Sequence, residues 1–430
     1  MTEALLSIKL MLRYWVKMID VGLLIQDKGI QGLDLSAPEK GNPGIGGTEY
    51  CFLLLAKFLN EDEDFDVTIY HFGDNKLPSK DIVCEDEEDA LKKASANSGK
   101  TLMIIKNLQE PSFYDLFDKY DLNYVMWCHN FLTYEEMNFF YNNERVKRCI
   151  CVGRQMYDYY VDHRIIDKME YCFNMVIPGN TSRIKEYDNN VTYIGSLISQ
   201  KHFHILAKHW KEIVREVPGA KLHVIGSGKL YDRTSKLGPL SVADIDYENE
   251  FLPYLEEDGK LMSSVIFHGI LGADKRDEVF ENTAVGVVNP MAATETFCLG
   301  AVEMEAVGIP VVTRKKNGLL DTVRDNETGL LYNDESELAQ KVIALLKNHE
   351  YNESLGKNAS NFARNEFLPE KIIPKWKNVL KEIADGRKAV YHKPVNHFEN
   401  NGKRIRMFIH SLHRIPFLKR IPSIHDIQKK

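Results

Sequence analysis

The sequence predicts an α/β protein with two domains, each built on a parallel sheet. The chain has 430 residues and 44% hydrophobic side chains, which is enough for two sizeable cores at about 100–200 residues per domain. Short apolar runs alternate with helix-period segments in both halves, as in parallel α/β units. Glycine-rich turns follow several of these runs, where a parallel sheet presents backbone amides to a ligand.

The first half contains an expected strand at 21–25 and a glycine-rich turn that opens a helix. Gly46 and Gly47 stand at this helix start, and small residues there let the backbone approach a ligand closely. The apolar residues of the helix recur at 3.6-residue spacing and are Cys51, Leu54, Leu55, Phe58 and Leu59. His129 follows the apolar run 124–127, which places an imidazole at the end of another expected strand.

The second half begins after 176–180, which is interpreted as a strand ending in a Pro-Gly turn and serving as the interdomain hinge. A new α/β series then starts. Its expected elements are a strand at 191–197, a helix at 201–217, a strand at 221–228, a strand at 265–269 and a helix at 274–282.

The most informative stretch runs from Asn289 to Thr313, with Glu295 in a loop and Glu303 inside a helix. Residues 297–300 would open that helix, so free N–H groups and the positive end of its dipole favour an anion there. The rise from the helix start to Glu303 is roughly 9 Å at about 1.5 Å per residue. A diphosphate at the helix start would therefore leave one carboxylate for each flanking sugar ring. We expect Glu295 to accept hydrogen bonds from the transferred sugar and Glu303 from the ribose.

From about Val21 to Lys347, these elements resemble in order the retaining glycosyltransferases of family 4, which have the two-domain GT-B fold. The resemblance implies catalytic roles for Glu295, for His129, which would reach the reacting sugar, and for Lys201, which would hold the departing diphosphate. It also implies a donor site in the cleft between the domains. The residues expected to bind the donor are Gly46, Gly47, Ser196, Gly226, Gly269, Phe297, Cys298, Leu299, Gly300 and Glu303.

One departure from the family pattern lies at Ser196, where the family has an arginine five residues before the lysine that is Lys201 here. A guanidinium gives a bidentate, permanently charged contact, whereas a hydroxyl gives one neutral hydrogen bond. Either another cation takes this place, with His202 and Arg154 as candidates, or activity is low.

The resemblance implies transfer of a sugar from a nucleoside diphosphate to an acceptor hydroxyl, with retention of anomeric configuration. The expected acceptor is a saccharide or a lipid-linked saccharide in surface-polysaccharide or glycolipid synthesis, and no nucleic acid partner is expected. Base, sugar and linkage are not distinguishable from these residues. Two alternatives stay open: a GT-B-like sugar-nucleotide epimerase, and a non-catalytic nucleotide-sugar-binding subunit, which only Ser196 favours.

No cofactor and no divalent metal are expected, since Lys201 and the helix start already offer positive charge to phosphate. Asp62-x-Asp64 and Asp244-x-Asp246 match the metal-binding pattern of another glycosyltransferase class. Neither pair follows an expected strand at a cleft, and acidic runs of this kind are usually solvated.

The seven cysteines include no C-x-x-C pair, which fits a reducing cytoplasm. The sequence has no run of about 18 uncharged apolar residues, so no membrane span is expected. Residues 1–17 are apolar but interrupted by cations and lack a small-residue cleavage site, so no signal peptide is expected. They are either an added amphipathic helix or an upstream start, with Met18 as the true initiator.

Four segments are expected: an acceptor-side domain at 1–178, a nucleotide-sugar-binding domain at 179–368, a helix crossing back at 369–401 and a basic tail at 402–430. The tail carries eight Lys or Arg against one acid, so its charge is +7 in a chain of net −7.

Apolar residues alternate with these cations, the composition of a segment that lies peripherally on an anionic membrane. Pro416 and Pro422 predict two short helices rather than one. Packing of the tail on its own acidic domain, or disorder, are the alternatives.

Overall fold

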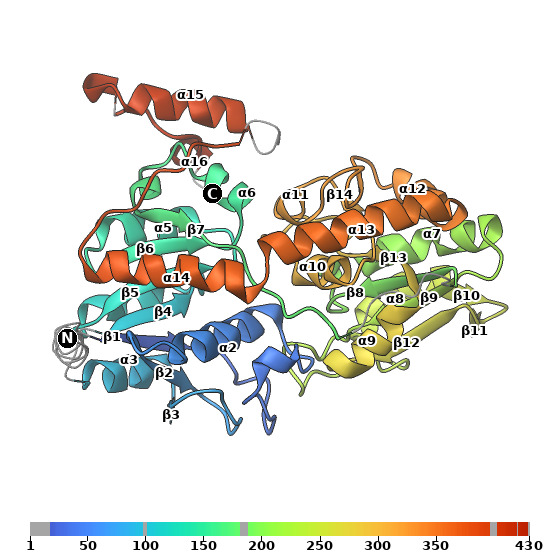
Figure 1. Cartoon of the computed structure of the whole chain (residues 1–430), viewed down its shortest axis with the longest axis horizontal. Helices are drawn as coiled ribbons and strands as arrows, with labels where there is room; N and C mark the ends of the chain where they lie inside the picture. The colour runs from blue at the N-terminus through green and yellow to red at the C-terminus, as the bar shows by residue number, and fades with distance from the viewer. Residues whose placement is uncertain (1–17, 98–100, 181–187, 396–401, 419, 429–430) are drawn as a thin grey trace, which may run out of the picture.

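The computed structural model describes residues 18–97, 101–180, 188–395, 402–418 and 420–428 (Figure 1). It has two α/β domains, each with a parallel sheet, and this confirms the predicted fold class. The added helix or alternative start expected at 1–17 lies outside the described residues.

The first domain has seven parallel strands in the order β3-β2-β1-β4-β5-β6-β7. They are β1 (Ile19–Leu24), β2 (Phe65–His71), β3 (Asp81–Val83), β4 (Leu102–Lys106), β5 (Asn123–Cys128), β6 (Val146–Cys151) and β7 (Met169–Tyr171). The central strands are buried on both faces, as expected for a parallel sheet covered by helices. The helices are α2 (Gly47–Asn60), α3 (Glu87–Ser95), α4 (Pro111–Tyr114), α5 (Tyr134–Asn142) and α6 (Arg154–Tyr159).

The second domain has six parallel strands in the order β12-β9-β8-β13-β14-β15. They are β8 (Asn190–Ile194), β9 (Lys221–Ile225), β12 (Val265–Gly269), β13 (Thr283–Val287), β14 (Val311–Arg314) and β15 (Gly329–Tyr332), and a two-stranded ribbon joins β10 (Glu256–Glu257) to β11 (Lys260–Leu261). The helices are α7 (Phe203–Glu216), α8 (Ile245–Leu255), α9 (Ala273–Glu281), α10 (Leu299–Ala306), α11 (Leu319–Thr322), α12 (Glu337–Lys347) and α13 (His349–Glu366).

The connection between the domains differs from the expectation at 176–180, and the strand predicted there is wrong. Residues 172–180 pair with no strand, and β7 is the last strand of the first sheet. Val176 instead donates its N–H to the carbonyl of Phe367 at 3.0 Å. Pro178 has no N–H to offer a ladder, which favours an extended linker at this point.

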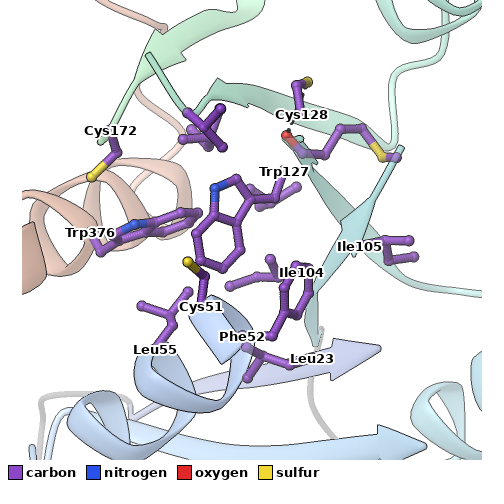
Figure 2. Close-up of a cluster of buried hydrophobic side chains, with 14 of the residues drawn as sticks. Leu23, Cys51, Phe52, Leu55, Ile104, Ile105, Trp127, Cys128, Cys172 and Trp376 are labelled. Carbon is purple, nitrogen blue, oxygen red and sulfur yellow. Dashed lines mark hydrogen bonds between the residues drawn. The ribbon is translucent and has the colours of Figure 1, made fainter. Parts of the chain in front are cut away.

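Helix α14 (Pro369–Ala384) returns from the second domain and packs on α2 and β1 of the first (Figure 1). Figure 2 shows Trp376 of α14 against Trp127 of β5, with ring centroids 4.6 Å apart. Ion pairs at the surface add to this apolar contact, since Lys377 lies 2.7 Å from Asp62 and Lys381 lies 2.5 Å from Asp64. The acidic pair Asp62-x-Asp64 thus faces lysines of the returning helix.

The tail forms α15 (Lys403–His413), a short 3-10 turn (Pro416–Leu418) and α16 (Ile424–Gln428), in line with two short helices. It lies on the first domain beside α6 (Figure 1). Lys403 pairs with Asp158 at 2.5 Å and Arg406 with Asp162 at 2.8 Å, and all four side chains are buried. In the part of the chain that the structure describes, no helix is long and apolar enough to cross a membrane.

Candidate active site

A cavity of about 450 Å³ lies between the domains, a size typical of small-ligand sites. The carboxyl ends of both sheets meet there, and each sheet contributes the point where its strand order reverses, between β1 and β4 and between β8 and β13. Most of the residues predicted from the sequence line this cavity. They are Gly47, His129, Ser196, Lys201, Gly226, Glu295, Phe297, Cys298, Leu299, Gly300 and Glu303.

Gly46 and Gly269 do not line the cavity, contrary to expectation. Gly46 is the residue before α2, and a Cβ there would lie 2.3 Å from the Glu49 carboxylate and 3.0 Å from the Tyr231 ring. Gly269 has φ of +68° and accepts a 2.8 Å hydrogen bond from the N–H of Gly226. Both glycines shape the backbone behind the wall, because close packing or a left-handed conformation excludes a side chain there.

The start of α10 faces the cavity through Phe297 to Gly300. Cys298 precedes the helix in the left-handed region, with φ of +77°, and no side chain of the described residues caps the first turn. A Cβ on Gly300 would lie 2.8 Å from Ile194, so glycine brings the helix close to the end of β8. The first-turn amides and the positive end of the helix dipole suit an anion.

Glu295 and Lys201 form an ion pair in the cavity wall. Lys201 donates from Nζ to Glu295 Oε2 at 2.8 Å, and Asn289 Nδ2 donates to the same oxygen at 2.8 Å. Burial alone would raise the pKa of Glu295, but Lys201 and Asn289 outweigh it and hold this pKa below its ordinary value. Burial likewise opposes the charge on Lys201, but Glu295 raises the net pKa of Lys201, so both groups are ionised at neutral pH.

Glu303 projects from α10 and receives a 2.7 Å hydrogen bond from Arg276 Nη1 of α9. Arg276 also contacts Asp277 at 3.1 Å, so this guanidinium is shared by two carboxylates. Burial raises the pKa of Glu303 above its ordinary value, although the charge of Arg276 opposes this shift. Glu303 thus presents to the cavity a carboxyl group that Arg276 holds in place.

His129 is only 8% exposed, and it lines the cavity. Nδ1 lies 3.2 Å from the Thr48 hydroxyl, while buried Nε2 has no hydrogen-bond partner among the described residues. Burial, with a contribution from Lys106, lowers the pKa of His129 well below its ordinary value, so the imidazole is neutral at pH 7. Its carbonyl accepts a 2.7 Å hydrogen bond from Thr296 of the second domain.

Ser196 lines the cavity but is buried and donates its hydroxyl to the carbonyl of Ser227 at 3.3 Å. Neither of the cations suggested as substitutes for the absent arginine lines the cavity. Arg154 pairs with Asp158 at 3.1 Å and donates to the backbone of Lys393. His202 has a left-handed backbone at the end of the turn that carries Lys201, which breaks the helix expected from 201, so that α7 begins at Phe203.

Within the described chain, the cations that line the cavity are Lys106, Lys201 and Arg276. Neither Lys106 nor Arg276 was predicted from the sequence. Arg276 lies in the helix expected at 274–282, but no spacing singles it out. Lys106 is the last residue of β4 and directly follows the apolar run 102–105, and a cation at the end of such a run was the signal available for it.

The fold and its cleft are those of GT-B proteins, in which two Rossmann-like domains face each other across a ligand site. Residues 180–362 match the family described as Glycosyl transferases group 1. The match falls on the second domain.

Related proteins support the same class. An uncharacterized glycosyltransferase of Methanocaldococcus jannaschii is 26% identical over 254 residues, which are 57% of this chain and 63% of that protein. A capsular polysaccharide biosynthesis glycosyltransferase of Staphylococcus aureus is 26% identical over 199 residues, or 45% of this chain and 47% of that protein. The chain thus spans less than two thirds of the length of both relatives. The structure of Anabaena HepE in complex with UDP-glucose matches 85% of this chain and 100% of its own, with a TM-score of 0.62 and 15% identity, and so shows the shared fold.

Proposed function

We propose that the protein is a retaining glycosyltransferase of family 4 that transfers a sugar from a nucleoside diphosphate to an acceptor hydroxyl without a divalent metal. The observation that carries this proposal is the Lys201–Glu295 pair, joined at 2.8 Å beside the uncapped start of α10. This arrangement offers positive charge to a diphosphate and a fixed carboxylate to the sugar attached to it.

In the proposed complex, the diphosphate lies against the first-turn amides of α10 and Lys201, as a helix start and a lysine suit phosphate oxygens. Glu295 accepts hydrogen bonds from the transferred sugar, and Nε2 of His129 contacts the same ring. Glu303 binds the ribose hydroxyls, held in place by Arg276. UDP-glucose, which is bound in the structure of HepE, is the first donor to test.

The reaction breaks the bond between the anomeric carbon and the diphosphate oxygen, and the electron pair leaves with the diphosphate. The acceptor oxygen forms the new bond on the same face of the sugar, and its proton passes to the departing phosphate. Lys201 and the amides of α10 stabilise the charge that develops on that phosphate, which is where preorganised donors contribute most. Closure of the two domains would orient donor and acceptor and exclude water.

The acceptor is proposed to be a saccharide or a lipid-linked saccharide in polysaccharide or glycolipid assembly, the setting that the name of the Staphylococcus aureus relative gives for that protein. The test of the transferase proposal is incubation with a panel of nucleotide sugars, followed by assay of free nucleoside diphosphate. Slow release is expected from at least one donor. Binding without release would favour the non-catalytic subunit, and interconversion of the sugars would favour the epimerase.

We also propose that residues 402–430 contact an anionic membrane at the cytoplasmic face of the cell. Lys403 and Arg406 point inward onto Asp158 and Asp162, so α15 turns apolar side chains outward, the reverse of an ordinary surface helix. The exposed large apolar residues of the tail are Ile405, Phe408, Ile415, Phe417 and Ile427. Exposed arginines at 414 and 420 lie near them in sequence and suit anionic headgroups.

The membrane proposal predicts that the protein sediments with vesicles rich in phosphatidylglycerol and less with neutral vesicles. Substitution of Phe408 and Phe417 by serine should lower the bound fraction at least tenfold, because both side chains are more than half exposed. Val83→Ser, at an exposed apolar position outside the tail, is the matched control. Equal binding by the double variant, or loss of an oligomer rather than of vesicle binding, would contradict the proposal.

A further inference from the structure

Lys106 stands apart from the other cations of the cavity because its charge is not matched by a carboxylate. Lys201 is paired with Glu295 and Arg276 with Glu303. Among the described residues, the Lys106 ammonium has no carboxylate within 4.0 Å and no hydrogen-bond acceptor, yet it lines the cavity and is partly buried. Removing a cation from water without a partner costs free energy, so such a group is expected to meet an anionic ligand.

The place of Lys106 in the sheet is fixed. It is the last residue of β4 and lies in register with Trp127 of β5, two residues before His129. Just beyond it, Asn107 and Asn130 exchange hydrogen bonds, with Asn107 donating to the Asn130 carbonyl at 3.2 Å and accepting from its N–H at 3.1 Å. Lys106 is thus held beside His129, at the point where the strand order of the first sheet reverses and where ligands of parallel α/β domains bind.

Two other polar atoms of the cavity wall are also without a protein partner. The buried Nε2 of His129 and the buried Oδ1 of Asn174 have no hydrogen-bond partner in the described part of the chain, and both residues line the cavity. Glu49 influences Lys106 only from beyond ion-pair distance, and burial raises the pKa of this carboxyl although Lys106 opposes the shift. The wall therefore offers one cation with hydrogen-bonding groups beside it.

We propose that Lys106 binds an anionic group, a phosphate or a carboxylate, carried by the acceptor near the hydroxyl that is glycosylated. This inference depends on the proposed transferase function, because it assigns the donor diphosphate to the opposite wall. There the start of α10 and Lys201, both in the second domain, supply positive charge. Lys106 belongs to the first domain, whose wall is left for the acceptor. A neutral saccharide acceptor would leave the partly buried charge of Lys106 without an anionic partner.

The test uses the full chain saturated with UDP, with inorganic phosphate as the probe, and follows the melting temperature. Phosphate should raise the melting temperature of the UDP-bound wild type and of Lys106→Arg beyond the rise produced by sodium chloride at equal ionic strength. Lys106→Met should lose this increment while its affinity for UDP stays within twofold of wild type. Lys76→Met, which removes a largely exposed lysine of the first domain, is the matched control and should keep the increment.

Three other results have distinct meanings. If phosphate gives the UDP-bound wild type no increment, or gives the same increment in Lys106→Met, the acceptor-anion assignment is overturned. If Lys106→Met instead loses at least tenfold in UDP affinity, the lysine serves the donor diphosphate and the assignment is again wrong. If neither UDP nor any other nucleoside diphosphate stabilises the wild type, the proposed transferase function itself fails.

Discussion

The Glu295 carboxylate accepts hydrogen bonds from Lys201 and Asn289, which fix its position without a bound ligand. A buried ion pair does not by itself imply stability, because desolvation offsets much of the attraction. The pair of Glu295 with Lys201 lies in the wall of a ligand cavity, where fixed charges stabilise developing charge without reorganisation. Function is therefore the more direct explanation for its position.

Replacing Glu295 by Gln should lower turnover by about 10²–10³-fold, the loss typical of one preorganised polar group in an active site. Nucleotide affinity should remain nearly intact, since the diphosphate is assigned to α10 and Lys201. Diphosphate release and nucleotide titrations measure the two effects separately.

Glu335→Gln is the matched control. This carboxylate also pairs with a lysine at 2.8 Å, but it lies at the surface and does not line the cavity. It should leave turnover unchanged. Turnover of Glu295→Gln at the wild-type rate would show that the assigned role is wrong.

Some residues of the candidate site could be predicted from the sequence, and others could not. Glu295 and Glu303 could be predicted because a strand, a loop and a helix start surround them within one short segment. Lys106 on β4 and Arg276 on α9 reach the same cavity from outside this segment, so the tertiary fold brings them there. Arg154 shows the reverse, since it was a candidate to replace the arginine that is absent at Ser196 but pairs with Asp158 instead.

At the scale of elements, Asp321 joins the two domains by capping a helix that belongs to the other one. Its Oδ2 accepts a 2.8 Å hydrogen bond from the N–H of Gln155 at the start of α6. A Cβ on Gly153 would lie 2.7 Å from the same oxygen, so glycine permits the approach. Burial raises the pKa of Asp321 to about 7, and nearby Asp158 adds to the shift.

This pKa predicts a specific dependence of stability on pH. The unfolded carboxyl ionises near its ordinary value of 3.8, whereas the folded one keeps its proton up to about 7. The folded state therefore binds more protons between these values, and the contribution of Asp321 to stability falls as pH rises from about 4 to 7. At 1.36 kcal/mol per pKa unit, the loss reaches up to about 4 kcal/mol.

Asp321→Asn should remove this dependence. Urea unfolding of the wild type and the variant at pH 5 and pH 8 measures it, and the stability difference between the two pH values should be smaller in the variant. Identical pH dependence in the two proteins would contradict the shifted titration.

A second prediction concerns the contribution of helix α14 to stability. Trp376→Ala should destabilise the protein by about 3–5 kcal/mol, because a fully buried indole in contact with Trp127 is replaced by a cavity. Urea unfolding measures the change. Phe417→Ala removes an aromatic ring that is 80% exposed and should change stability by less than about 0.5 kcal/mol.

Most elements were predictable from local pattern, because buried parallel strands are short apolar runs followed by glycine or polar turns. The strand expected at 176–180 fails for a reason outside the local pattern. The backbone N–H of Val176 donates to the carbonyl of Phe367 in the returning chain rather than to a neighbouring strand. Apolar runs alone do not distinguish the two outcomes.

For the whole molecule, the walls of the cleft contact each other directly. Thr296 donates to the carbonyl of His129 at 2.7 Å, and Arg233 donates to that of Gly44 at 2.5 Å. A Cβ on Gly47 would lie 2.6 Å from Leu299, so the glycine turn lets α2 approach the start of α10. Both domains therefore contribute to one ligand cavity, and donor and acceptor would meet within it.

A crystal structure of the protein soaked with UDP would show directly whether the start of α10 and Lys201 bind the donor diphosphate. The diphosphate should lie within hydrogen-bond distance of the backbone amides at 298–300 and of the Lys201 ammonium, with the ribose at Glu303. UDP bound elsewhere, or bound in this cavity with its diphosphate turned away from α10, would contradict the account.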